Sequence, residues 1–137
     1  MKITRNELLF RNNFIAIEFQ HEDDWMYVNW RGFVSHHDVV DGCEEMLRLV
    51  KERQITAILN DNTLVEGMWS GAAKWGGEVW FPALRTAGLQ RFAWIYSPSV
   101  LSRLSTDKTL RHTKSPDYIK VFDDIDLAKD WLRSSST

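Results

Sequence analysis

Apolar runs of strand length alternate with amphipathic helical stretches along almost the whole chain, and this alternation is what most constrains the fold. Residues 13–20 and 25–30 are rich in β-branched and aromatic side chains, as is typical of strands. The polar residues 21–24 between them form a connection short enough for a hairpin. The sequence therefore predicts an opening pair of antiparallel strands.

An amphipathic helix is expected after this hairpin. Ser35 suits the N-cap, and Asp38 follows three residues later, near the positive end of the helix dipole. At about 100° per residue, the apolar side chains between Val39 and Val50 fall on one face and the charged side chains on the other. The pattern predicts a helix that ends near Arg53 and packs one face on a sheet.

The rest of the chain continues the alternation. Strands are expected at residues 56–60, 91–96 and 118–122, and helices at residues 71–86, 100–105 and about 124–133. Pro82 predicts a kink or a late start in the helix that contains it. Residues 106–117 are polar and predict an ordered loop or a frayed helix end. The order β-β-α-β-α-β-α-β-α implies an α/β fold with a mixed, mostly parallel sheet and covering helices.

Length and composition fit one domain over residues 1–137, with a core at about 14–132 and a frayed tail at 133–137. The formal net charge of −2 gives no global field that would recruit nucleic acid or an anionic membrane. The lone Cys43 excludes an internal disulfide and fits a reducing compartment. The N-terminus holds no signal-peptide core, and the longest apolar runs are far shorter than the ~20 residues of a membrane span. A cytoplasmic location is expected.

Short motifs spread over residues 14–132 carry a resemblance to a known family. They are Trp30-x-Gly32, the strand end Ile58-Leu59-Asn60-Asp61, Gly88-Leu89 before Phe92-Ala93-Trp94-Ile95, and Phe122-Asp123-Asp124 with Ala128-x-x-Trp131-Leu132. In this order and spacing the chain resembles the SpoIIAA-like family, a bacterial group related to STAS domains and also linked to lipid-carrier domains of the CRAL-TRIO type. The resemblance implies a STAS-like fold and a non-enzymatic regulatory or binding module.

The resemblance also implies a candidate switch. STAS relatives are often regulated by phosphorylation of a serine or threonine at the start of the helix after the third strand. Thr63 and Ser70 are the candidates in the matching stretch 61–71, which lacks the paired serines of the sporulation regulators. The alternative is that Thr63 satisfies a turn and Ser70 caps a helix.

No motif in the sequence predicts catalysis, a metal or a cofactor. His37 and Asp41 have the spacing at which helical ligands converge, but two ligands do not make a metal site. Residues 67–71 resemble a nucleophile elbow with the serine displaced by one position. Cys43 falls on the apolar face of its helix, which favours a core thiol over a nucleophile. We therefore expect no catalytic residue, no bound metal and no cofactor.

Basic residues gather in the polar stretch after residue 105. Lys108, Arg111 and Lys114 could hold an anion or a lipid headgroup, although Asp107 and Asp117 dilute their charge. The alternative is an ordinary solvated surface.

Tryptophan is the one residue type out of proportion, with seven in the chain. Apolar residues in and just before the predicted helix 71–86 spread over an arc wider than the ~100° stripe that one buried face needs. They are Trp69, Trp75, Val79, Trp80 and Phe81. Surplus apolar surface marks an interface or a ligand groove, unless neighbouring loops cover it.

Two functional readings of this aromatic helix stay open. It forms the interface of a homodimer or meets another protein partner, or it lines a pocket for a small apolar or lipid-like ligand. An enzyme is the weakest reading, because the sequence shows no convergent polar groups.

Overall fold

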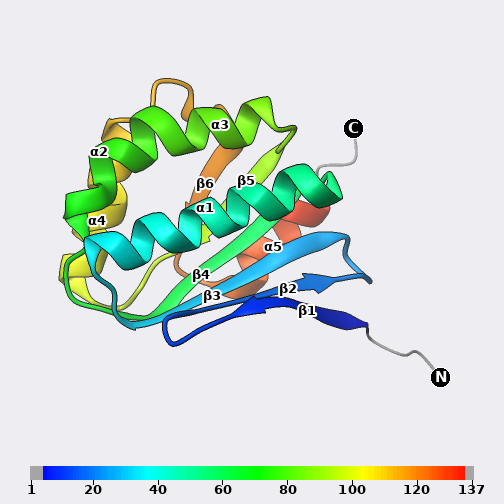
Figure 1. The fold of residues 1–137 in the computed structure, drawn as a ribbon, viewed down its shortest axis with the longest axis horizontal. Helices are drawn as coiled ribbons and strands as arrows, with labels where there is room; N and C mark the ends of the chain where they lie inside the picture. Colours follow the sequence, from blue (N-terminus) through cyan, green and yellow to red (C-terminus); the bar gives the residue numbers. More distant parts are fainter. Residues whose placement is uncertain (1–4, 135–137) are drawn as a thin grey trace.

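The computed structural model describes residues 5–134, which form a six-stranded sheet with helices on both faces (Figure 1). The strands are β1 (Asn6–Arg11), β2 (Ile15–Gln20), β3 (Trp25–Phe33), β4 (Ala57–Glu66), β5 (Arg91–Ile95) and β6 (Ile119–Phe122). The helices are α1 (His36–Arg53), α2 (Ala73–Trp75), α3 (Phe81–Thr86), α4 (Val100–Arg111) and α5 (Ile125–Arg133). Residues 135–137 of the predicted tail lie outside the described residues.

The strands lie in the sheet in chain order, from β1 to β6. β1, β2 and β3 pair antiparallel, whereas β3, β4, β5 and β6 pair parallel. Helical connections join the parallel strands, as crossovers of this kind require. The predicted α/β fold with a mixed, mostly parallel sheet is therefore confirmed.

The predicted order of elements was wrong at its beginning, because β1 precedes the hairpin. β1 pairs with β2 at the edge of the sheet, and their register shifts between Leu8 and Phe10. Leu8 is exposed, while Leu9 and Phe10 are partly buried against the main core. The irregular pairing breaks the strict alternation of apolar and polar residues by which a half-buried strand is recognised.

α1 and the helical segment 70–86 cover one face of the sheet, and α5 covers the other (Figure 1). The main core lies under α1 and α3, where Ile58, Phe81 and Phe92 are fully buried. A smaller cluster around Trp25 and Leu132 lies under α5. Among residues 5–134, no helix is both long and apolar enough to cross a membrane.

The predicted start of α1 is confirmed. The Asp38 N–H donates to Ser35 Oγ at 3.1 Å, and the Ser35 N–H donates to the Asp38 carboxylate at 3.0 Å. This reciprocal capping box satisfies two N–H groups that have no partner inside the helix. It fixes where the chain turns from β3 into α1.

The predicted helix 71–86 is one helical segment that changes type along its length. A 3-10 turn (Ser70–Ala72) leads into α2, a π-helical turn (Gly76–Trp80) follows, and α3 completes the segment. In the wide turn, the Phe81 N–H donates to the carbonyl of Gly76, five residues earlier. Pro82 has no N–H to donate and lies in the first turn of α3. The irregularity expected at Pro82 is thus a change of helix type.

α4 is longer than the sequence predicted. Because residues 106–117 are polar, the pattern placed its end near Ser105, but the helix continues to Arg111. Its inward side consists of hydroxyl side chains, and Ser102, Thr106 and Thr109 are almost completely buried. Apolar periodicity cannot reveal a helix that packs in this way.

Candidate functional site

A cavity lies in the main core, where α1, the segment 70–86 and α4 approach the carboxyl ends of β4 and β5. The centre of a water molecule can reach about 40 Å³ of it, more than the ~10–15 Å³ that one water needs. Its walls hold five of the seven tryptophans, namely Trp30, Trp69, Trp75, Trp80 and Trp94. Ligands of open α/β sheets commonly bind at this end of the strands.

Hydrogen bonds hold three of these indole rings in place. Trp30 Nε1 donates to Asn60 Oδ1 at 2.9 Å, and Trp69 Nε1 donates to Ser102 Oγ at 3.0 Å. Trp80 Nε1 donates to the carbonyl of Cys43 at 2.7 Å. Because a buried N–H needs an acceptor, these bonds fix the rings as rigid walls.

Trp94 differs from these three rings. Its side chain is only 4% exposed, and its buried Nε1 has no hydrogen-bond partner within residues 5–134. The ring packs against Trp69 and Phe81, with centroids 6.0 and 5.5 Å apart. Leaving a buried donor without an acceptor costs about 1–3 kcal/mol. A donor in this state marks a position where an acceptor atom would bind favourably.

Two asparagines add a polar strip to the cavity wall. Asn60 Nδ2 donates to Asn62 Oδ1 at 3.2 Å, so the amide of Asn60 has partners on both of its ends. Asn62 Nδ2 makes no hydrogen bond to another described residue. Asn60 also lies opposite Trp94 in the β4–β5 register. The cavity therefore offers two donors, Trp94 Nε1 and Asn62 Nδ2, that the protein itself does not use.

The lining of the cavity carries no charge. Among the described residues, no Asp, Glu, Lys, Arg or His side chain lines it. Cys43 does line it, and complete burial raises the pKa of that thiol well above its ordinary value. A neutral thiol is a poor nucleophile, so the walls offer no group for acid–base or nucleophilic chemistry.

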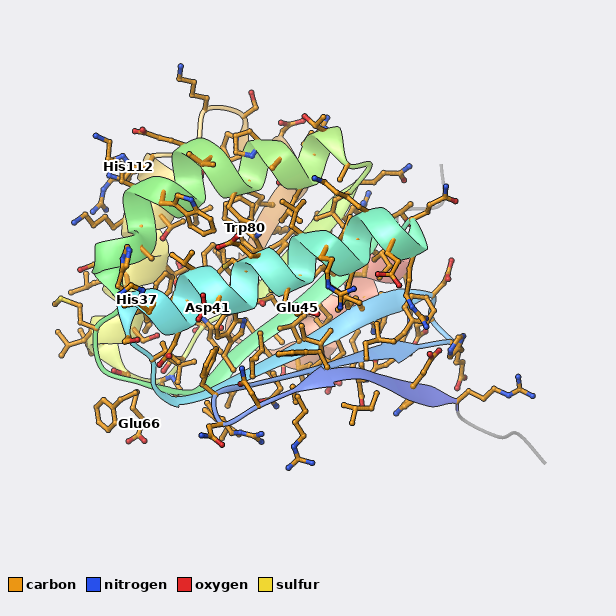
Figure 2. All side chains as sticks on the ribbon, viewed as in Figure 1. His37, Asp41, Glu45, Glu66, Trp80 and His112 are labelled. Atoms are coloured by element: carbon orange, nitrogen blue, oxygen red, sulfur yellow. The ribbon has the colours of Figure 1, made fainter. Side chains whose placement is uncertain are left out.

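Most of the aromatic-helix residues singled out by the sequence line this cavity. Trp69, Trp75, Trp80 and Phe81 do so, whereas Val79 is 55% exposed and lies outside it. Figure 2 shows Trp80 between α1 and the helical segment above it. Trp69, Trp80 and Phe81 are buried in the chain's own core, so an intact fold leaves only Val79 and part of Trp75 to meet a partner there. Self-association stays a prediction.

The residues predicted to bind an anion lie away from the cavity. Lys108 and Arg111 project from α4, Lys114 follows its end, and all three are exposed. None of them lines the cavity, so they do not accompany the aromatic residues as a headgroup site inside it.

The two candidate phosphorylation sites lie near the end of β4 and at the turn that follows. The Thr63 N–H and hydroxyl both donate to Asp61 Oδ1, but Thr63 lies inside β4, which continues to Glu66, so the predicted turn at this position was wrong. Ser70 is the first residue of its 3-10 turn, and the capping position before it belongs to Trp69. The reading of Ser70 as a cap was therefore wrong by one residue.

The histidines do not assemble a site. In Figure 2, His37, Asp41 and Glu45 follow one another along α1, and within residues 5–134 no three metal-binding side chains come together. His112 Nδ1 lies 3.5 Å from Glu78 Oε2, but both side chains are partly exposed and neither lines the cavity. A histidine and a carboxylate inside a cleft would have supported an enzyme, and this pair lies on the surface instead.

The sequence reasoning missed the strand residues of the site. Trp30, Asn60, Asn62 and Trp94 reach the cavity from β3, β4 and β5. One signal was available, since two asparagines follow directly on a buried apolar strand. Polar side chains at the carboxyl end of such a strand commonly face a ligand site.

Comparisons with known proteins support the fold. No protein-family model matches the chain, and no curated protein matches it either. It is similar in structure to an uncharacterised protein of the DUF3478 family with a SpoIIAA-like fold, from Shewanella loihica PV-4. The two share 24% sequence identity over 96% of this chain and 98% of the other, with a TM-score of 0.52. The chain therefore has a SpoIIAA-like fold, as the sequence resemblance predicted.

Cys43 provides a first test of how closed the cavity is. We expect its thiol to react with a disulfide reagent at least about tenfold more slowly in the native protein than in urea, because each unit of raised pKa removes about tenfold of the thiolate. The rate is measured from the colour of the released thiol. Equal rates in native and unfolded protein would contradict the buried position of Cys43.

Proposed function

We propose that this chain is a non-enzymatic binding module whose tryptophan-lined cavity holds a small uncharged molecule, apolar or lipid-like in its buried part. The observation that carries the proposal is the buried, unpartnered Nε1 of Trp94 in the cavity wall. Such a donor favours a ligand that brings an acceptor, such as a carbonyl or ether oxygen.

The uncharged lining supports a neutral ligand. A carboxylate or ammonium group inside the cavity would lose its hydration without gaining a charged partner, which is strongly unfavourable. Aromatic walls instead favour apolar and planar groups, whose burial contributes about 25 cal/mol per Å² of apolar surface. The buried part of the ligand is therefore apolar, with one or two acceptor atoms.

The size of the cavity indicates which wall would move. Space for only a few waters excludes a larger ligand unless a side chain is displaced. Trp75 is the half-buried tryptophan of the lining, and its indole makes no hydrogen bond to another described residue. Gly76 and Gly77 follow it in the wide π-helical turn. We infer that Trp75 is the side chain that gives way on binding.

Native mass spectrometry of protein purified gently from its own host tests the proposal. We expect a defined extra mass, which organic solvent extracts and which can then be identified. The same spectrum reports whether the chain self-associates. Protein at the mass of the bare chain, with no ligand in the solvent extract, would count against the proposal.

A matched pair of variants places the ligand in the cavity. Trp94→Phe removes the unpartnered donor and is expected to weaken binding about tenfold, the value of one hydrogen bond in a dry site. Trp80→Phe removes the same atoms from another wall, but its donor already serves the Cys43 carbonyl. It should therefore keep more of the bound mass while losing about 1 kcal/mol more of the free energy of unfolding. If the two variants bound the ligand equally well, Trp94 would not donate to the ligand.

A further inference from the structure

α4 packs with its polar side inward, the reverse of an ordinary surface helix. Ser102, Ser105, Thr106 and Thr109 are almost completely buried. Ser102 Oγ and Ser105 Oγ accept hydrogen bonds from the side chain and the backbone of Trp69, at 3.0 and 3.1 Å. Small side chains also suit the close approach of Gly77, where an added Cβ would lie 2.6 Å from the carbonyl oxygen of Thr109.

The outward side of α4 is apolar over its first half and basic over its second. Val100, Leu101 and Leu104 are exposed, and Leu104 is 53% exposed. Lys108 and Arg111 follow on the same side, since residues three and four apart share a helix face. At 1.5 Å per residue, the two basic residues lie about 6–10 Å further along the axis than Leu104. Leu101 and Leu104 point away from the core, so core packing does not account for them.

Two further exposed apolar side chains flank the turn at Gly67, which leads to Trp69, a contact residue of α4. Phe33, at the end of β3, is 78% exposed, and the contact distances at Gly67 place its ring beside that residue. Met68 is exposed and precedes Trp69, whose N–H donates to Ser105 of α4. We call this set the apolar tip, and its members are Phe33, Met68, Val100, Leu101 and Leu104. α4 lies at one end of the sheet (Figure 1).

The charges near the apolar tip are unbalanced. Lys74, Lys108, Arg111 and Lys114 form no ion pair within residues 5–134. Of the neighbouring acids, Asp117 and Asp123 are paired with arginines, whereas Asp107 accepts from the Tyr96 hydroxyl and keeps its negative charge. Glu66 is a further acid, which lies opposite Phe33 in the β3–β4 register and is exposed. The net charge of −2 still conceals a local basic excess along α4, because residues 100–114 hold four basic residues and one acid.

We propose that the apolar tip inserts into the surface of an anionic lipid bilayer, with Lys108, Arg111 and Lys114 at the level of the headgroups. The spacing fits, because the polar layer on each side of a bilayer is about 5–8 Å thick. Apolar side chains at a tip with basic residues behind them are the combination that binds anionic lipid interfaces. The lysine stems can extend toward the headgroups while the leucines enter the acyl region.

A second copy of the chain fits the same surface less well. A two-fold contact that extended from the apolar tip along the outward side of α4 would bury the unpaired basic residues of both copies in one interface, which is unfavourable. The five side chains also come from three separate segments, and Phe33 lines a pocket with Arg31 and Asp38, away from the leucines of α4. A fluid apolar phase needs no matching shape, whereas a protein partner does.

Co-sedimentation with lipid vesicles tests the proposal. The wild-type chain is expected to bind vesicles of phosphatidylcholine with about 30% phosphatidylserine at least about tenfold more tightly than vesicles of phosphatidylcholine alone. Raising the salt from about 0.1 M to about 0.5 M should weaken this binding. Equal, weak binding to both vesicle types would overturn the proposal.

Variants separate the apolar and basic contributions. The double variant Leu101→Gln/Leu104→Gln is expected to lose at least about tenfold in vesicle binding, because it removes two inserting side chains. Leu127→Gln is the matched control, since Leu127 is similarly exposed but lies on α5, and its binding should not change. Lys108→Gln should cost about fivefold, and Glu66→Gln should strengthen binding. If Leu127→Gln lost as much vesicle binding as Leu101→Gln/Leu104→Gln, the apolar tip would not be the binding surface.

The outcome for a second copy is distinct. If Leu101→Gln/Leu104→Gln halves the mass seen by sedimentation and leaves vesicle binding unchanged, the apolar tip is a self-interface and the proposal fails. An unchanged urea midpoint for each variant shows that the fold is retained. No residue of the apolar tip lines the cavity, so Trp94→Phe is expected to leave vesicle binding unchanged.

Discussion

Replacing Phe81 by alanine is expected to lower the free energy of unfolding by about 3–5 kcal/mol. Phe81 is fully buried, and its ring lies 4.8 Å from that of Trp80, 5.0 Å from Phe92 and 5.5 Å from Trp94. These rings are large and held by their own strands and helices, so they cannot close over the space that a missing phenyl ring leaves. Urea unfolding followed by tryptophan fluorescence measures the loss.

Val79→Ala is the control, because Val79 lies two residues earlier in the same helical segment and is mostly exposed. Its change should stay within about 0.5 kcal/mol. The pair also decides between the two readings of the aromatic helix. If Phe81→Ala left stability unchanged and altered the assembly state instead, Phe81 would belong to an interface and its buried position would be wrong.

The parts of the fold that the sequence predicted are those fixed by local chemistry. Ser35 and Asp38 cap α1 through their own backbone groups, and the hairpin of β2 and β3 closes over four polar residues. Buried strands such as β4 and β5 appear as short apolar runs whatever surrounds them. Signals of this kind need no knowledge of the partner element.

The parts that the sequence missed depend on distant neighbours. β1 lies at the edge, and its irregular pairing with β2 leaves no alternating pattern. The inward hydroxyls of α4 depend on distant neighbours, because Ser102 and Ser105 accept from Trp69 and Gly77 leaves space beside Thr109. Each element becomes intelligible only when its contact partner is known.

The cavity shows the same limit at the level of the site. A helical wheel of residues 71–86 shows too much apolar surface for one buried stripe, which led to the alternatives of an interface and a pocket. It cannot show that Trp30 and Trp94 complete the lining from two strands, because that depends on register. Asn60 lies opposite Trp94 only through the parallel pairing of β4 and β5. The residues that make the site polar therefore come from the sheet, outside the helix that first attracted attention.

Replacing Gly77 by alanine is expected to destabilise the protein, although the same change in an ordinary helix interior stabilises it by about 1 kcal/mol. A Cβ at this position would lie 2.6 Å from the carbonyl oxygen of Thr109 and 2.8 Å from the carbonyl carbon of His112. Both atoms belong to the backbone, so α4 or the segment 70–86 must shift to make room. Overpacking of this kind costs about 1–3 kcal/mol.

Gly71→Ala is the matched control for this reversal of sign, because an added Cβ there would meet its nearest neighbour, His36 Nδ1, at an ordinary 3.5 Å. Its stability should change by no more than about 0.5 kcal/mol. Urea midpoints of the two variants give the comparison. Since Thr109 also lines the cavity, a shift of α4 in Gly77→Ala should widen the cavity and make Cys43 react faster. If Gly77→Ala stabilised the protein instead, the close contact between Gly77 of the segment 70–86 and Thr109 of α4 would be wrong.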